Sequence, residues 1–285
     1  MKLIISRKGF DAKYGGMASP ILPDGRLLPL PIPNEHDART FADLNVNKID
    51  LGRILSDLSH DVHTLETRIH LDPDLDRAKR LRPRGWRPSL GTAQGHLINN
   101  LVGTGDIFLF FGWFREVEQS KGVWRYVKGA TNKHVLFGWL EIAEALPIVR
   151  MREEILSAHP WIADHPHVAN PAHYRSIKSN IYISTKRSQL STGAKFGGGL
   201  FPQYSDELRL TADGCKKRSL WNLPKWFMPK KGREPLSYHS DPARWTLNRN
   251  HVQLQSVAIG QEFILDGAQY PEVEDWLASI VGSHV

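Results

Sequence analysis

Apolar residues fall into short runs separated by segments rich in glycine and proline. The densest run, Ile107 to Phe111, follows Gly-Thr-Gly-Asp106 and leads into Gly-Trp-Phe-Arg115. A short apolar run bounded by turn residues is typical of a buried strand. A second such run, His134 to Ile142, also contains Gly-Trp. Further strands are predicted at 2–5, 181–184, 208–211 and 259–264.

Other segments predict helices or loops. Helices are expected at Asp50 to Leu58, Pro147 to Ala158 and Val273 to Val281, and Gln94 opens a fourth. The segment from Gly9 to Pro33 predicts an irregular loop with a hairpin at Pro23-Asp24-Gly25. We therefore expect an α+β fold, a curved sheet or small β-barrel with surrounding helices and long loops, in one domain covering residues 1–285. The paired Gly-Trp elements would place aromatic rings at the mouth of this sheet.

The charge balance points to a polyanionic partner. The 285 residues include 37 Lys and Arg against 30 Asp and Glu, which gives a formal net charge of +7 and a pI of about 9.5. A basic enzyme with no nucleic-acid role is the alternative. Cys215 is the single cysteine, which excludes an internal disulfide and a cysteine-rich zinc site. The first apolar run is too short for a signal-peptide core, so a cytoplasmic protein without membrane spans is expected.

Basic residues cluster in two segments that also carry tryptophan. These are Arg77 to Arg87 and Lys216 to Lys231. Arginine binds phosphate through two hydrogen bonds and stacks on bases. The alternatives are a solvated charge run and tryptophans that anchor the core. The residues predicted to contact DNA phosphates are Arg7, Lys8, Arg80, Arg82, Arg84, Arg87, Lys216, Lys217 and Arg218.

Three carboxylates are candidates for catalysis. Asp11 lies in the glycine-rich loop, Asp74 in His-Leu-Asp-Pro-Asp, and Glu262 within a short apolar run. Burial of a carboxylate in such a run favours acid–base chemistry unless a basic residue compensates. Asp106 is instead interpreted as a turn residue. The candidates for holding a base or substrate are Tyr14, Gln94, His96, Trp113, Phe114 and Gln261.

Metal and cofactor motifs are weak. The Asp72 to Asp76 segment has Asp-x-Asp spacing without an EF-hand pattern. The loop Trp161 to Tyr174 is rich in histidine but lacks the i, i+4 pairing of a typical zinc helix. The glycine-rich loops at Gly15 and Gly197 do not have P-loop spacing. No metal and no cofactor are therefore predicted.

The sequence resembles two groups of proteins. The turn at Gly105-Asp106 and the returning strand at His134 to Ile142 resemble PUA-like domains, including the ASCH and EVE groups, several of which hold modified nucleobases. A wider series of segments resembles the third nucleotide-modification-associated domain, found in bacteria and their phages. These segments are KGFDAKYGG, SPILPDGRLLPLPIP, HLDPDL, GTAQGHL, GDIFLFFGWFR, LRLT, SLWNLPKWF and GQEF.

This wider resemblance implies a role on modified nucleotides or modified DNA. It also points toward phage-defence DNA glycosylases that excise glucosylated hydroxymethylcytosine, so phage DNA carrying modified bases is the expected partner. The leading hypothesis is a glycosylase that flips its target base and uses a carboxylate to assist hydrolysis of the N-glycosidic bond. A non-catalytic reader of modified DNA and a transferase that modifies a base or nucleotide are the alternatives. The oligomeric state stays open.

Overall fold

A mixed β-sheet runs through the middle of the molecule. The computed structural model describes residues 1–44, 46, 48–75, 82–258 and 260–285. The order along the main path of the sheet is β12-β1-β4-β6-β7-β3. These strands are β1 (Lys2–Arg7), β3 (Ser89–Thr92), β4 (Ile107–Ser120), β6 (Lys133–Pro147), β7 (Asn180–Ser184) and β12 (Glu262–Asp266). Three short strands, β2 (Ser19–Ile21), β5 (Val123–Tyr126) and β8 (Gly198–Leu200), pair off this path.

The sheet is mixed because β1 and β2 both pair in parallel with β4, whereas the other pairs are antiparallel. A smaller antiparallel sheet has the order β10-β11-β9. Its strands are β9 (Leu220–Leu223), β10 (Trp245–Leu247) and β11 (Val252–Gln255). The molecule is thus a mixed α/β protein with a large mixed sheet and a small antiparallel sheet.

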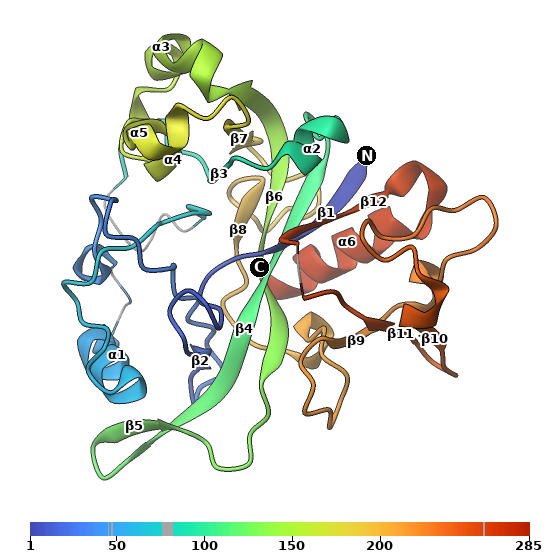
Figure 1. Cartoon of the computed structure of the whole chain (residues 1–285), viewed down its shortest axis with the longest axis horizontal. Helices are drawn as coiled ribbons and strands as arrows, with labels where there is room; N and C mark the ends of the chain where they lie inside the picture. Colours follow the sequence, from blue (N-terminus) through green and yellow to red (C-terminus); the bar gives the residue numbers. More distant parts are fainter. Residues whose placement is uncertain (45, 47, 76–81, 259) are drawn as a thin grey trace.

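Helices lie around the central strands. They are α1 (Leu51–Ser59), α2 (Gly95–Asn99), α3 (Ile148–Ala158), α4 (Pro166–Ala169), α5 (Pro171–Tyr174) and α6 (Glu272–His284). Short 3-10 turns occur at Phe41–Asp43, Pro160–Ile162, Asp206–Leu208, Lys225–Phe227, Pro242–Arg244 and Gly267–Gln269. Figure 1 shows α1 and the N-terminal loops on one side of β4 and β6, with α6 and the small sheet on the other.

The barrel expected from the sequence is wrong for the described residues. The end strands of the path, β12 and β3, do not pair, so the sheet stays open. The predicted strand at 208–211 is also absent as a regular element. A 3-10 turn ends at Leu208, and Arg209 and Thr211 form only isolated bridges. The predicted turn at Asp106 is present, because its carboxylate accepts the N–H groups of Gly103 and Lys2 at 2.9 and 2.7 Å.

Strand register separates two faces of the central sheet. Ser6 is paired with Glu262 on one side and Phe110 on the other, so these three side chains share one face. We call it the polar face. Arg7 is paired with Phe111 and lies on the opposite, aromatic face. Phe111 there contacts Trp221 of β9, with ring centroids 5.0 Å apart.

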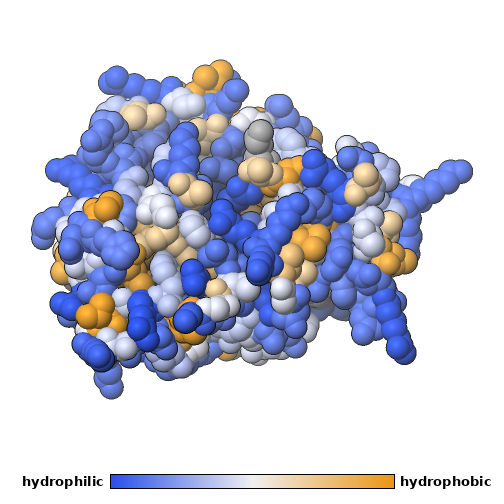
Figure 2. All heavy atoms as spheres, turned by 60° about the horizontal axis from the view of Figure 1, so that its bottom comes forward, coloured by the Kyte–Doolittle hydropathy of each residue, from blue (hydrophilic) through white to orange (hydrophobic). Residues whose placement is uncertain are grey.

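The aromatic face is closed by a large hydrophobic core. This core joins the central strands to the small sheet and to α6, and its members include Phe111, Trp221, Phe263 and Leu277. Separate cores form around α1 and around α3, and include Phe10, Phe41 and Ile54 in the first and Trp86, Ile148 and Trp161 in the second. In the view of Figure 2, hydrophilic residues predominate and hydrophobic ones form small separate patches. No described helix is both long enough and apolar enough to cross a membrane.

Candidate active site

Four histidines and two aspartates gather from three separate segments. Asp37 comes from the N-terminal loop, and His70 and Asp72 come from the chain before β3. His165, His167 and His173 come from the turns around α4 and α5. The first five are each no more than 9% exposed, and His173 is partly buried. We call these six residues the His–Asp cluster.

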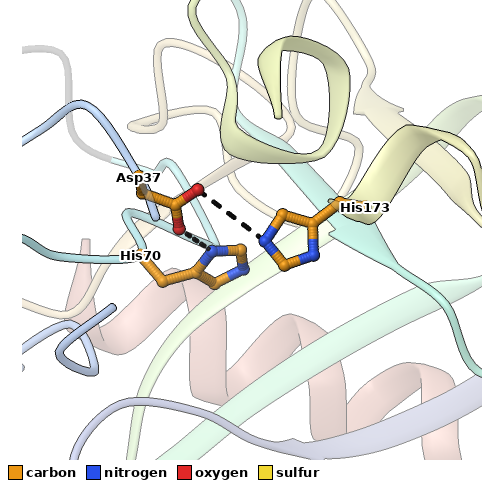
Figure 3. A group of neighbouring side chains, drawn as sticks. All are labelled: Asp37, His70 and His173. Carbon is orange, nitrogen blue, oxygen red and sulfur yellow. Dashed lines mark hydrogen bonds and ion pairs between the residues drawn. The ribbon is translucent and has the colours of Figure 1, made fainter. Parts of the chain in front are cut away.

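Asp37 joins two of the imidazoles (Figure 3). Its Oδ2 lies 2.6 Å from His70 Nδ1, and its Oδ1 lies 3.7 Å from His173 Nε2. Oδ1 also accepts a hydrogen bond from the side-chain amide of Asn170 at 2.8 Å. Burial alone would raise the pKa of Asp37, but the interactions with His173, His70 and Asn170 hold this pKa far below its usual value. Asp37 is therefore an anion that fixes the orientation of His70.

Asp72 contacts the other histidines of the cluster. Its Oδ1 accepts the backbone N–H of Gly91 at 2.7 Å and lies 3.3 Å from His165 Nε2. Its Oδ2 lies 4.0 Å from both His70 Nε2 and His167 Nε2. Burial alone would raise the pKa of Asp72. The close approach of His165, together with the charges of His167 and Lys8, instead holds this pKa well below its usual value.

Local sequence explains how the histidine loop folds. Pro166 begins α4 at a position where its missing N–H costs nothing, and the preceding His165 caps the helix. His165 Nδ1 accepts the backbone N–H of His167 at 3.3 Å. Gly91 then packs directly on His167, because a Cβ built at Gly91 would lie 2.2 Å from the His167 ring. Burial lowers the pKa of His167 well below its usual value, although Asp72 opposes this effect.

An ion pair lies beside this cluster on the polar face. Lys8 Nζ donates to Glu262 Oε1 at 3.1 Å, and the two side chains are 11% and 2% exposed. Ser6, opposite Glu262 in the sheet, is fully buried, and its hydroxyl has no hydrogen-bond partner among the described residues. Because the charge of Lys8 also lowers the pKa of Asp72, Lys8 electrostatically couples Glu262 to the His–Asp cluster. We call the cluster, Ser6, Lys8 and Glu262 together the polar centre.

Several predicted binding residues lie near Glu262. The side chain of Gln94 donates to that of Gln261 at 3.2 Å, and Gln261 is exposed. His96 Nε2 lies 3.0 Å from Ser237 Oγ, and its ring packs on Tyr238 with centroids 4.6 Å apart. Burial lowers the pKa of His96, while Glu262 opposes this shift. The structure therefore brings Gln94, Gln261 and Glu262 into one neighbourhood.

A second group of predicted residues lies on the aromatic face. The Arg218 guanidinium stacks 4.3 Å from the centre of the Trp113 ring, and Trp113 Nε1 donates to Asn132. Burial lowers the pKa values of Arg7 and Arg218, and the charge of Asp11 opposes both shifts. Asp11 Oδ1 accepts the backbone N–H groups of Lys13 and Tyr14, each at 2.7 Å, and so closes a turn. The Tyr14 ring is exposed, and the Lys13 ammonium lies over its face, 5.0 Å from the ring centre.

Other predicted site residues are buried, and their partners lie inside the protein. Phe114 is fully buried and packs on Phe137, so its ring is not presented to a base. Asp74 is buried and binds the Arg82 guanidinium through both of its oxygens. Arg87 is buried as well, and donates to Glu144 and to the Ser184 carbonyl. Arg82 and Arg87 are therefore not presented to DNA phosphates, whereas Arg84, Lys216 and Lys217 are exposed. Arg80 lies outside the described residues.

Sequence reasoning missed most of the polar centre. From sequence, the histidine loop is discounted as a metal site because it lacks i, i+4 spacing, and the segment that begins at Asp72 because no EF-hand pattern follows it. Asp37 and Ser6 carry no local signal at all, because only the fold brings them to this place. A search for His-x-Asp followed by a distant histidine-rich loop would have found two of the three segments of the His–Asp cluster.

A mixed α/β protein with buried imidazoles beside buried carboxylates has the groups that an enzyme needs to transfer protons or bind a cation. Residues 2–266 match the family described as nucleotide modification associated domain 3, and the chain belongs to that family. The family implies involvement with nucleotide modification. Searches of curated proteins and of solved structures each found no match.

Proposed function

We propose that this protein is a DNA glycosylase that removes a hypermodified cytosine, such as glucosylated hydroxymethylcytosine, and leaves an abasic site. Glu262 carries the proposal, because it is a buried carboxylate that adjoins the exposed Gln261. Lys8 pairs with it, so its candidacy rests on this position and not on uncompensated burial. Membership of a nucleotide-modification family and a net charge of +7 support a DNA substrate.

In this mechanism Glu262 accepts a proton from water as the water oxygen bonds to C1′ of the deoxyribose. The bond between C1′ and the base nitrogen breaks, and the base leaves with the electron pair. The base is protonated from solvent, and Glu262 returns its proton to solvent, so that one water is consumed in total. A carboxylate also stabilises the positive charge that develops on the sugar. Gln261 is exposed and adjoins Glu262, so the carboxylate lies one residue from the surface. Gln94, which donates to Gln261, would contact the flipped base from the same side.

The test uses duplex DNA with glucosylated hydroxymethylcytosine and the same duplex with cytosine. After incubation, alkali should cleave the modified strand at the modified position, and mass spectrometry should show the released base. Glu262→Gln keeps the size of the side chain and should slow release by about 100-fold or more. Glu118→Gln is the matched control, because Glu118 pairs with Arg125 at the surface, and should release base like the wild type.

Two outcomes would sink this proposal in favour of its alternatives. Tight binding of modified DNA with no change in its mass indicates a reader. An increase in the mass of the DNA in the presence of a donor nucleotide indicates a transferase. Wild-type release by Glu262→Gln would remove Glu262 from the mechanism.

A further inference from the structure

The geometry of the His–Asp cluster points to a metal site. We propose that His70 Nε2, Asp72 Oδ2 and His167 Nε2 bind one divalent transition-metal ion. Candidate ligand atoms of these three buried residues all lie within 4.8 Å of one another. Two imidazoles and one carboxylate are the protein ligands found in catalytic zinc sites and in non-haem iron sites. The inference does not depend on the proposed function.

The separations fit a metal ion after a small contraction. Ligand atoms about 2.1 Å from a tetrahedral zinc ion lie about 3.4 Å apart. Asp72 Oδ2 is 4.0 Å from each of the two Nε2 atoms, so the side chains need to close by about half an ångström. Asp72 also borders a cavity of about 50 Å³, which has room for a water molecule.

Hydrogen bonds orient two of the ligands for this role. His70 Nδ1 lies 2.6 Å from Asp37, which directs the other ring nitrogen toward Asp72. A carboxylate behind a histidine ligand is the usual outer-shell arrangement in metal sites. The Gly91 N–H occupies Asp72 Oδ1 at 2.7 Å and leaves Oδ2 for the ion. Asp37 and Gly91 would thus position the ligands without touching the metal.

His165 is excluded as a ligand by its tautomer. Its Nδ1 accepts the His167 N–H, so neutral His165 carries its proton on Nε2. This Nε2–H faces Asp72 Oδ1 at 3.3 Å and has no lone pair to offer. In His167 it is Nε2 that faces Asp72 Oδ2, at 4.0 Å, whereas its Nδ1, like His165 Nε2, is buried without a hydrogen bond within the described part of the chain. A metal ion at Nε2 would give this buried ring a partner at that nitrogen, and the ring proton would then lie on Nδ1.

The experiment loads the full chain with Zn²⁺ or Co²⁺ without DNA, removes free ion by dialysis and measures bound metal by elemental analysis. One ion per chain is expected, with visible absorption bands from bound Co²⁺ and a rise in Tm on loading. His167→Gln and Asp72→Asn should each lower affinity by at least about 10-fold. His165→Gln should weaken binding less than His167→Gln. His36→Gln replaces an exposed histidine beside Asp37 and should bind like the wild type.

The inference is overturned if the loaded wild type keeps less than about a tenth of an ion per chain. It is also overturned if His167→Gln and Asp72→Asn, shown to be folded by circular dichroism, bind as tightly as His36→Gln. If either variant unfolds, the stoichiometry and Co²⁺ spectrum of the wild type decide. Base release is measured separately, so loss of the glycosylase proposal leaves this result standing, and the reverse also holds.

Discussion

The aromatic face and the polar centre differ in what surrounds their buried side chains. On the aromatic face, Phe111, Trp221 and Phe263 pack ring against ring, and His134 accepts a hydrogen bond from Trp221 Nε1. In the polar centre, Ser6 Oγ and His167 Nδ1 are buried without hydrogen-bond partners among the described residues, and each lies near a buried carboxylate, Glu262 and Asp72 respectively. Native interiors seldom leave such atoms unpaired without a reason. The packed rings of the aromatic face stabilise the fold, and the polar centre brings together the buried carboxylates and imidazoles that proton transfer or metal binding requires.

The histidines of the two faces also have different neighbours. On the aromatic side His239 is fully buried, its Nδ1 donates to the Ser237 carbonyl, and its Nε2 accepts the Val257 N–H. Burial lowers the pKa of His239 to about 4, and the charge of Arg244 adds to this shift. On the polar face, Asp72 opposes the effect of burial on His167. Because the pKa of His167 is nevertheless lowered, acid should act on both regions through buried histidines, and on the carboxylates of the polar centre only at lower pH.

The largest effect in this comparison is predicted for pH. The pKa of His239 is about 6.5 when the chain is unfolded and about 4 when folded, so the unfolded chain binds its proton first. Stability from this group is complete above pH 6.5 and falls as pH drops to about 4, by about 3 kcal/mol in total. Urea unfolding at pH 7.5, 6, 5 and 4 measures this slope. His239→Gln should reduce the pH dependence of the free energy of unfolding over this range, whatever the stability of the variant at pH 7.5.

The carboxylates of the polar centre should respond at lower pH. The pKa values of Asp37 and Asp72 are both held below the usual range, so their contribution is present above about pH 4 and is lost as pH falls further. An equal slope between pH 6.5 and 4 in wild type and His239→Gln would contradict the assignment to His239.

A smaller loss of stability is predicted for a side chain added at Gly91, where the backbone contacts the His–Asp cluster. An alanine at Gly91 would place its Cβ 2.2 Å from the His167 ring, so the imidazole must move. Overpacking of this kind costs about 1–3 kcal/mol. Gly103→Ala is the matched control, since no atom lies within 4 Å of a Cβ at that site. Thermal unfolding should show a lower Tm for Gly91→Ala but not for Gly103→Ala. Equal Tm values for the two variants would show that the His167 ring moves aside at little cost in stability.

The contrast between the faces explains what the sequence could predict. Runs such as Ile107 to Phe111 are buried on both sides, so hydrophobicity alone located β4 and β6. The small sheet was harder to see, because β9 and β11 have only four residues each and pair across a long connection. The barrel failed because closure depends on the pairing of end strands, which no local pattern encodes.

Site prediction followed the same logic. Glu262 could be singled out because a carboxylate within a short apolar run is unusual, and the structure pairs it with Lys8, which the sequence predicts to contact DNA phosphates. Arg82 and Arg87 look like phosphate ligands in the sequence, yet Asp74 and Glu144 bind them inside the protein. A basic run cannot reveal which arginines face inward, since that depends on partners far along the chain. The His–Asp cluster needs three distant segments and follows only from the fold.

The smallest effects should come from the exposed cations. Lys216 and Lys217 are exposed in the second basic segment, and Arg84 is exposed in the first. These side chains can therefore reach phosphates. Lys216→Gln with Lys217→Gln should reduce the slope of log K against log salt by about 2 and weaken binding of modified and unmodified DNA alike. Arg82→Gln should instead lower the Tm, because it leaves Asp74 buried without its guanidinium. Fluorescence anisotropy at 50 to 200 mM salt, with Lys121→Gln as an exposed control, separates these cases. If replacing Lys216 and Lys217 together leaves the salt slope unchanged, DNA does not contact this basic segment.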